Sequence, residues 1–186
     1  MRGAPALAGL AAAAAVAFAG ARAEAHPLDE VVQAAYLTLA PGEVQLDLEI
    51  QPGVLVAGGI ARDVDANGDG RISEAEARAY GERVLRASTL TVDGAPAELK
   101  LLRVQAPAYA NLVQGDILRV YAVARREDRA GAGVLAYANR YSPAKSQCQA
   151  NVFLSMGGGW TYAVASQGHG PDGRRLDVAY RVARGT

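Results

Sequence analysis

The stretch Glu43-Val44-Gln45-Leu46-Asp47-Leu48-Glu49-Ile50-Gln51 decides the fold, because polar and apolar side chains alternate along it without a break. A period of two puts every apolar side chain on one face of an extended chain, which is typical of a half-buried β-strand. Pro41-Gly42 stands just before this stretch and is typical of a tight turn. The preceding run Ala35-Tyr36-Leu37-Thr38-Leu39 therefore predicts a second strand, paired with the first in a hairpin.

Most of the remaining chain repeats this pattern in short runs bounded by Gly, Pro and Asp. The runs are Thr89–Val92, Ala97–Val104, Ile117–Ala124, Val134–Tyr141, Gln149–Leu154, Trp160–Ser166 and Leu176–Val182. Asp93-Gly94 and Gly170-Pro171-Asp172-Gly173 are turn sequences within the series. About eight or nine short strands at this spacing predict a mainly β fold, an antiparallel β-sandwich. We expect its core to include Phe153, Trp160 and Tyr162. The alternative is a sugar-binding platform, which exposed aromatic side chains on one sheet face would favour.

One insertion between the second and third predicted strands departs from this period. From Ser73 to Ser88 the chain is rich in Ala, Glu and Arg, and apolar residues recur at spacings of three and four, which is typical of an amphipathic helix. The incoming segment Pro52–Val64 contains Gly58-Gly59, and each glycine costs a helix interior about 1 kcal/mol. We therefore expect one good helix, preceded by a helix reduced to a turn or two, in an insertion at about 53–88.

The loop between these two segments satisfies the EF-hand calcium pattern at every position that the pattern constrains. It reads Asp65-Ala66-Asn67-Gly68-Asp69-Gly70-Arg71-Ile72-Ser73-Glu74-Ala75-Glu76. Calcium takes about six to eight oxygen ligands. The predicted donors are the side chains of Asp65, Asn67, Asp69, Ser73 (directly or through water) and Glu76, and the backbone carbonyl of Arg71. We expect Gly70 to allow the sharp bend and Ile72 to anchor the loop in the core.

An Asx- and Gly-rich turn capped onto a helix would explain part of the same sequence, with Ser73 as N-cap and Glu76 as its capping-box partner. It explains neither Asp65 nor Asn67 nor the spacing of Gly70. Three carboxylates gathered without a cation would repel one another, which favours calcium. The sequence holds no second loop to support the first, so we expect a dissociation constant of about 10⁻⁴–10⁻³ M.

The order of these features resembles the extracytoplasmic domain found in front of some bacterial nickel/cobalt transporters of the high-affinity type. The resemblance covers roughly Ala25 to Val104 and rests on Ala25-His26-Pro27-Leu28, the hairpin, the EF-hand loop with its following helix, and Val92-Asp93-Gly94. It implies a β-sandwich with an inserted EF-hand. It also implies an inner-membrane metal transporter as a candidate partner. The sequence contains no transmembrane bundle, so the resemblance implies an accessory or sensing role.

Residues 1–25 are typical of a secretory signal peptide: Arg2 precedes an uncharged, Ala-rich stretch from Ala4 to Ala21. Small residues then permit cleavage before Glu24 or before His26, and an uncleaved N-terminal anchor is the alternative. We expect residues 26–186 to form one periplasmic or secreted domain without a membrane span.

A transition-metal site is the main alternative to calcium. If cleavage follows Ala25, the amine and imidazole of His26 could chelate copper or nickel together with His169, the only other histidine. Both side chains could equally be solvated.

Composition and the scarcity of reactive residues exclude several other classes. Basic and acidic residues number 19 each, so no charge excess favours nucleic acid. Cys148 is the only cysteine, which excludes an intramolecular disulfide and leaves a small core residue or a free reactive thiol. No nucleophile motif, phosphate loop or acid–base pair is present, and Ser142, Ser146 and Cys148 have no histidine near them in sequence. We expect a binding protein rather than an enzyme.

Overall fold

The computed structural model describes residues 28–185, and within that range the chain forms ten strands and three helices. In order these are β1 (Val31–Ala40), β2 (Glu43–Pro52), α1 (Val54–Val64), α2 (Glu74–Arg86), β3 (Ser88–Val92), β4 (Ala95–Pro96), β5 (Lys100–Gln105), α3 (Tyr109–Leu112), β6 (Leu118–Arg125), β7 (Gly131–Asn139), β8 (Ser146–Leu154), β9 (Trp160–His169) and β10 (Arg175–Arg184). The predicted signal peptide and His26 lie outside the described residues.

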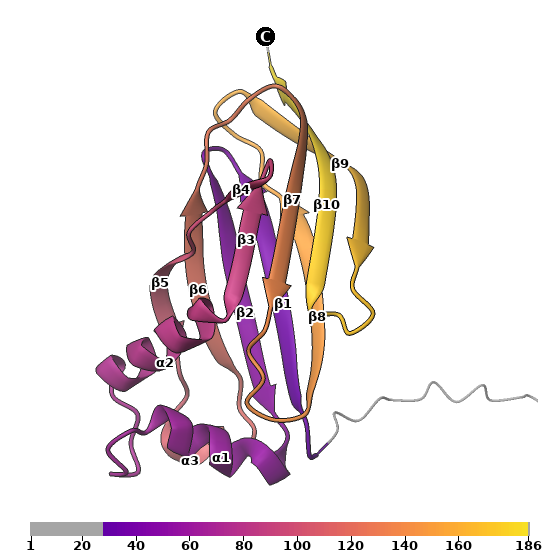
Figure 1. Ribbon diagram of the computed structural model, residues 1–186. Helices are drawn as coiled ribbons and strands as arrows, with labels where there is room; N and C mark the ends of the chain where they lie inside the picture. The colour runs from indigo at the N-terminus through magenta and orange to yellow at the C-terminus, as the bar shows by residue number, and fades with distance from the viewer. Residues whose placement is uncertain (1–27, 186) are drawn as a thin grey trace, which may run out of the picture.

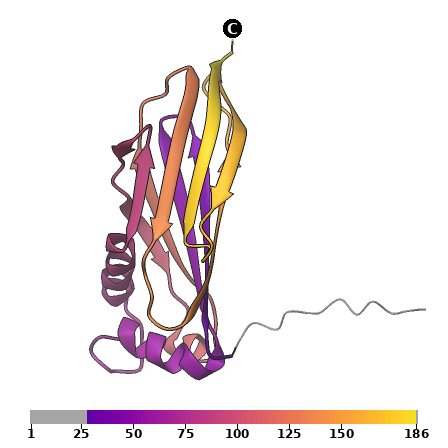
Figure 2. The same ribbon diagram turned by 45° about the vertical axis from the view of Figure 1, so that its right-hand side comes forward.

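The strands form two five-stranded sheets, in the orders β5-β6-β2-β1-β8 and β4-β3-β7-β10-β9. The sheets lie as two layers, with α1 and α3 at one end and α2 along one edge (Figures 1 and 2). Buried side chains of both sheets belong to one core, among them Leu37, Leu48, Leu135, Tyr137 and Val178. The structure thus confirms the predicted mainly β fold.

The stretch that alternates polar and apolar residues is strand β2, as predicted. Val44, Leu46, Leu48 and Ile50 are at most 1% exposed. β2 pairs with β1 along its whole length, with Ala40 opposite Glu43 across the Pro41-Gly42 turn. Asp93-Gly94 joins β3 to β4, and both of its residues have positive φ, as a type I′ hairpin turn requires.

The prediction of an antiparallel arrangement of eight or nine strands is wrong in two respects. First, β1 and β8 pair in parallel, from Val31 opposite Ser146 to Leu39 opposite Leu154. This pairing arises because the chain crosses from the second sheet to the first between β7 and β8. Second, the predicted strand Ala97–Val104 is replaced by β4 and β5, which lie in different sheets. The Ala97 N–H still donates to Leu90 O of β3 at 2.9 Å, and from Lys100 the chain pairs with β6 of the other sheet.

The aromatic residues assigned to the core divide between two environments. Tyr162 is buried and Trp160 packs against the core as a half-buried residue. Phe153 is 52% exposed, so its placement in the core was wrong. On β8 the neighbouring Ala150 points inward and is buried, and the period of two puts Phe153 on the opposite face.

The first helix of the insertion is longer than predicted. α1 has 11 residues, about three turns. Its buried residues Ala57, Ile60, Ala61 and Val64 form one apolar face, and burial of that face outweighs the cost of Gly58-Gly59. α2 follows the prediction, with Ser73 as its N-cap. Its Gly81 has a packing reason: a Cβ there would lie 2.4 Å from Val104 Cγ2 on β5.

A buried ion pair between Arg126 and Asp128 lies where the β1–β2 turn meets the second sheet. Arg126 Nη1 donates to the Tyr180 hydroxyl at 2.8 Å. Asp128 accepts from the Tyr162 hydroxyl at 2.7 Å and from the Gly42 N–H at 2.7 Å. Burial alone would raise the pKa of Asp128, but the hydrogen bonds from Arg126, Tyr162 and Gly42 outweigh it and hold the pKa below its usual value. The cluster therefore ties both sheets to the β6–β7 connection.

Replacement of Asp128 tests this cluster. We expect Asp128→Asn to lower the free energy of unfolding by about 3 kcal/mol at pH 7, because Arg126 then stays buried without its counter-ion. A carboxylate with a lowered folded-state pKa stabilises the protein above its unfolded pKa of about 3.9 and loses that effect as the pH falls. The deficit of Asp128→Asn in urea denaturation should therefore shrink below about pH 4. Asp116→Asn, at an exposed site, is the control; an equal effect of both variants would contradict the role of Asp128.

Candidate metal centre

The six predicted calcium ligands extend from the end of α1 through the connecting loop into the first turn of α2. Figure 1 shows this connection between the two helices. Asp65 is the C-cap of α1, and its N–H donates to Ala61 O at 2.9 Å. Ser73 is the N-cap of α2, and Glu76 lies in the first turn of that helix. Two helix ends therefore hold the first and the last ligand of the loop.

The carboxylate of Asp65 organises the first half of the loop. Its Oδ1 accepts hydrogen bonds from the N–H groups of Gly68 at 2.9 Å and Asp69 at 3.2 Å, and its Oδ2 accepts from the Gly70 N–H at 2.9 Å. Gly70 has a φ of 75°, a conformation that glycine adopts without strain. The bend predicted at Gly70 is confirmed. Asp65 itself is only 5% exposed, so three backbone donors compensate the burial of its charge.

The carboxylate of Glu76 closes the loop. Its Oε1 accepts from the Asn67 N–H at 3.2 Å, and its Oε2 accepts from the Ser73 N–H at 2.9 Å and the Ser73 hydroxyl at 2.7 Å. Hydrogen bonds from the Ser73 backbone, the Ser73 side chain and the Asn67 backbone hold the pKa of Glu76 below its usual value. The Glu76 N–H donates back to Ser73 Oγ and completes a capping box. Glu76, the last residue of the calcium pattern, thus contacts Asn67, the third residue of the pattern.

The remaining predicted ligands are linked to one another. Asn67 Nδ2 donates to Asp69 Oδ2 at 3.2 Å, and Asn67 Oδ1 accepts from the Asp69 N–H at 2.8 Å. Asp69 Oδ1 accepts from the Arg71 N–H at 2.9 Å, and the Arg71 side chain is exposed. Ile72 is half-buried against the core, which confirms its predicted anchoring role.

The donor set of this loop consists of oxygen atoms alone, the ligands that calcium prefers over softer metals. Among residues 28–185, however, no three Asp, Glu, His or Cys side chains approach closely enough to form a metal-binding group. The carboxylates of Asp65, Asp69 and Glu76 are instead engaged by backbone amides, Asn67 and Ser73. The residues therefore fit calcium chemically, and ion binding requires their side chains to turn toward a common point.

Side chains of α2 connect the loop region to the two sheets. Arg83 Nη2 donates to the carbonyl of Asp63 near the end of α1 at 2.8 Å, and its guanidinium lies 5.1 Å from the centre of the Tyr80 ring. The hydroxyls of Tyr80 and Tyr141 are 2.6 Å apart, and the two rings meet edge to face. Burial is the main cause that raises the pKa of both tyrosines, so both hydroxyls stay protonated. Tyr141 lies just after β7, outside the insertion.

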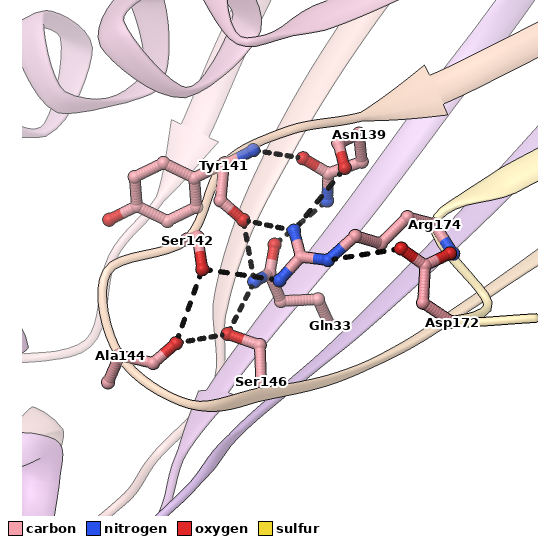
Figure 3. A network of polar contacts seen from close by, with 8 residues as sticks. All are labelled: Gln33, Asn139, Tyr141, Ser142, Ala144, Ser146, Asp172 and Arg174. Carbon is pink, nitrogen blue, oxygen red and sulfur yellow. Dashed lines mark hydrogen bonds and ion pairs between the residues drawn. The ribbon is translucent and has the colours of Figure 1, made fainter.

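A buried polar network fixes the backbone around Tyr141 (Figure 3). Gln33 on β1 is 1% exposed; its Nε2 donates to Tyr141 O and to Ser146 Oγ, both at 3.1 Å, and its Oε1 accepts from Asn139 Nδ2 at 2.8 Å. Arg174 Nη1 donates to Tyr141 O at 2.8 Å from the segment before β10. No sequence pattern predicts these contacts, because the residues that make them are far apart in the chain. Burial of Tyr80 follows from its helical spacing, but its partner stands 61 residues away.

The two residues of the alternative metal site are not brought together within the described part of the chain, since His26 lies outside it. His169 ends β9, and its Nε2 lies 2.9 Å from the carbonyl of Ala150 on β8. Cys148 is half-buried, and burial raises the pKa of its thiol. It therefore stays a thiol rather than a thiolate, which fits a small packed residue.

Comparison with known proteins adds no relative: no protein-family model and no curated protein matches this sequence. Within residues 28–185, each helix is too short or too polar to span a bilayer. Function has therefore to be argued from the loop and its surroundings.

A double-mutant cycle on the two tyrosines measures how strongly the insertion is coupled to the sheets. We expect Tyr80→Phe and Tyr141→Phe each to lower the free energy of unfolding by about 1–3 kcal/mol, because each leaves the other hydroxyl without its partner. The double variant should lose less than the sum, with a coupling energy of about 1 kcal/mol in urea denaturation. Strictly additive losses would show that this hydrogen bond carries no coupling.

Proposed function

We propose that this chain is an exported calcium-binding protein in which one EF-hand, with its loop from Asp65 to Glu76, is inserted into a β-sandwich. The observation that carries the proposal is the closure of the loop. Glu76, the twelfth residue of the pattern, accepts from the N–H of Asn67, the third, while Asp65 accepts from three amides. This geometry keeps the oxygen atoms required for calcium on one tightly folded segment.

Calcium would be held by Asp65, Asn67, Asp69, Arg71 (through its carbonyl), Ser73 and Glu76. To bind it, Asn67 and Asp69 would exchange their mutual hydrogen bond for the ion, and Glu76 would exchange its contact with the Ser73 hydroxyl. These exchanges involve side chains on one loop, so they need no movement of the sheets. A doubly charged ion would also offset the repulsion among three carboxylates. With a single loop, we keep the expected dissociation constant of about 10⁻⁴–10⁻³ M.

The ion would act on more than the loop. Arg83 links α2 to the end of α1, and the Tyr80–Tyr141 hydrogen bond links α2 to the β7–β8 crossover. Calcium would therefore fix the insertion against the sheets and order a surface for a protein partner. The resemblance to domains in front of nickel/cobalt transporters makes an inner-membrane metal transporter the candidate partner. The predicted signal peptide supports a periplasmic or secreted accessory protein.

Thermal unfolding with calcium, magnesium or chelator tests the site. A ligand at about 100 times its dissociation constant adds about 2.7 kcal/mol of stability, and each kcal/mol raises the Tm of a domain of this size by about 2–4 °C. About 10 mM calcium is roughly 10–100 times the expected dissociation constant, so we expect it to raise the Tm by roughly 3–10 °C, and magnesium to raise it much less.

Two conservative variants in the first turn of α2 control this experiment. Glu76→Gln keeps a hydrogen-bond acceptor for Ser73 but loses the bidentate carboxylate, so the calcium shift should disappear. Glu74→Gln changes the same charge in the same turn at a position that the pattern leaves free, and it should keep the full shift. An equal shift in both variants, or none in the wild type at 10 mM calcium, would refute the calcium site and leave a capped turn.

A further inference from the structure

The outer face of the β5-β6-β2-β1-β8 sheet carries a row of side chains that the calcium site does not use. The cross-strand register aligns one residue from each of the five strands: Arg103, Tyr121, Asp47, Tyr36 and Asn151. Phe153, two residues beyond Asn151 on β8, lies beside Tyr36 with the ring centroids 6.1 Å apart. The helices lie at one end and one edge of the molecule and leave this face uncovered (Figures 1 and 2).

Asp47 occupies the centre of this row, on the central strand of the sheet, between two tyrosines. Aspartate is disfavoured in strands. Its Oδ1 is shielded from solvent and has no hydrogen-bond partner within residues 28–185. Burial, followed by the charge of Glu49, raises the pKa of Asp47. A shielded acceptor without a donor costs free energy. The Asp47 side chain also lines a cleft, so its carboxylate can accept a hydrogen bond from a ligand there.

Two arginines lie near Asp47, and their charges oppose the rise of its pKa, but each has another partner. Arg119 Nε donates to Glu49 Oε1 at 2.7 Å, and the Arg103 guanidinium lies over the Tyr121 ring at 3.6 Å from its centre. Two acidic and two basic groups thus surround the centre of the row, and their charges balance. A balanced set of charges gives no net attraction for an ionic ligand.

The row borders a cleft of about 340 Å³, near the lower end of the size range of small-molecule sites. Its walls include Tyr36, Gln45, Asp47, Leu102, Tyr121 and Phe153. Leu102 and Phe153 are each more than half exposed, although the neighbouring outward residues of β2 and β8 are largely polar. Leu102 on β5 and Phe153 on β8 thus border the cleft from the two edges of the sheet. Exposed apolar side chains around a cleft on an otherwise polar face are typical of a binding surface.

We propose that this cleft binds one sugar ring of a neutral glycan. The apolar C–H face of the ring packs against Phe153, while the Tyr36 ring, tilted by 53° from that of Phe153, borders the sugar from the side. A ring hydroxyl donates a hydrogen bond to the carboxylate oxygen of Asp47 that faces the cleft, rather than to the shielded Oδ1. A sugar combines the two features that the cleft requires, a flat apolar face and an edge of uncharged donors. This site is separate from the EF-hand loop and does not rest on calcium binding.

Saturation-transfer NMR on the full chain tests the assignment, with maltose, cellobiose, lactose and N,N′-diacetylchitobiose as neutral probes and choline as a cationic probe. We expect saturation to reach the ring C–H protons of at least one disaccharide. Phe153→Ala and Asp47→Ala should each weaken that binding about tenfold, the effect expected for loss of one good contact. Val134→Ala removes an apolar residue of similar exposure from β7 in the other sheet and should leave binding unchanged.

Weaker sugar binding by Asp47→Ala would not be caused by unfolding. This substitution removes an acceptor that has no partner within the described part of the chain, so the variant should melt at or above the Tm of the wild type. Glu76→Gln should bind the disaccharide as the wild type does, which separates this proposal from the calcium site. Saturation of choline alone, no transfer to any of the four disaccharides, or binding as tight as that of the wild type in both cleft variants would each overturn the sugar assignment.

Discussion

Burial of the apolar faces of β1 and β2 is the constraint on which the rest of the molecule depends. These two strands lie in the middle of their sheet, so their inward side chains must be covered by the second sheet and their edges by β6 and β8. Neither sheet could bury its apolar face alone. The helical insertion leaves the chain at the end of β2, where α1 buries its own apolar face on the end of the same core. The candidate metal loop is therefore positioned by the core rather than by the helices alone.

Buried polar groups at the two ends of β1 fix how the two sheets are placed relative to each other. Gln33 and Asn139 bind each other and the β7–β8 crossover near the start of the strand, and Arg126 and Asp128 bind the turn after it. Hydrogen bonds offset most of the cost of burying such groups and also require particular partners. Apolar packing alone would tolerate small shifts between the sheets; these networks tolerate few. Tyr141 joins one network to α2, so the position of the insertion is tied to the registration of the sheets.

The local sequence pattern was sufficient to predict the structure wherever residues close together in the chain determine the conformation. The alternation in β2, the turns at Pro41-Gly42 and Asp93-Gly94, the capping box of Ser73 and Glu76, and the bend at Gly70 all follow from contacts within a few residues. Prediction failed where distant residues decide. The length of α1 depends on the burial of its apolar face by the core. The exposure of Phe153 depends on which sheet β8 joins, and the Tyr80–Tyr141 contact depends on the topology of the whole domain. Loop spacing predicts which residues could bind a metal ion but not the direction in which each of their side chains points.

The parallel pairing of β1 with β8 has a consequence for the order in which the fold can be completed. β1 and β2 are neighbours in sequence and can form a hairpin early, whereas β8 arrives only after most of the chain has been made. Pairing between such distant segments is slow, because a long loop must be closed first. Until then one edge of β1 presents unpaired backbone groups that can associate with another chain. Aggregation during synthesis should thus compete with folding until β8 is added, and the arrival of this late strand ends the vulnerable period.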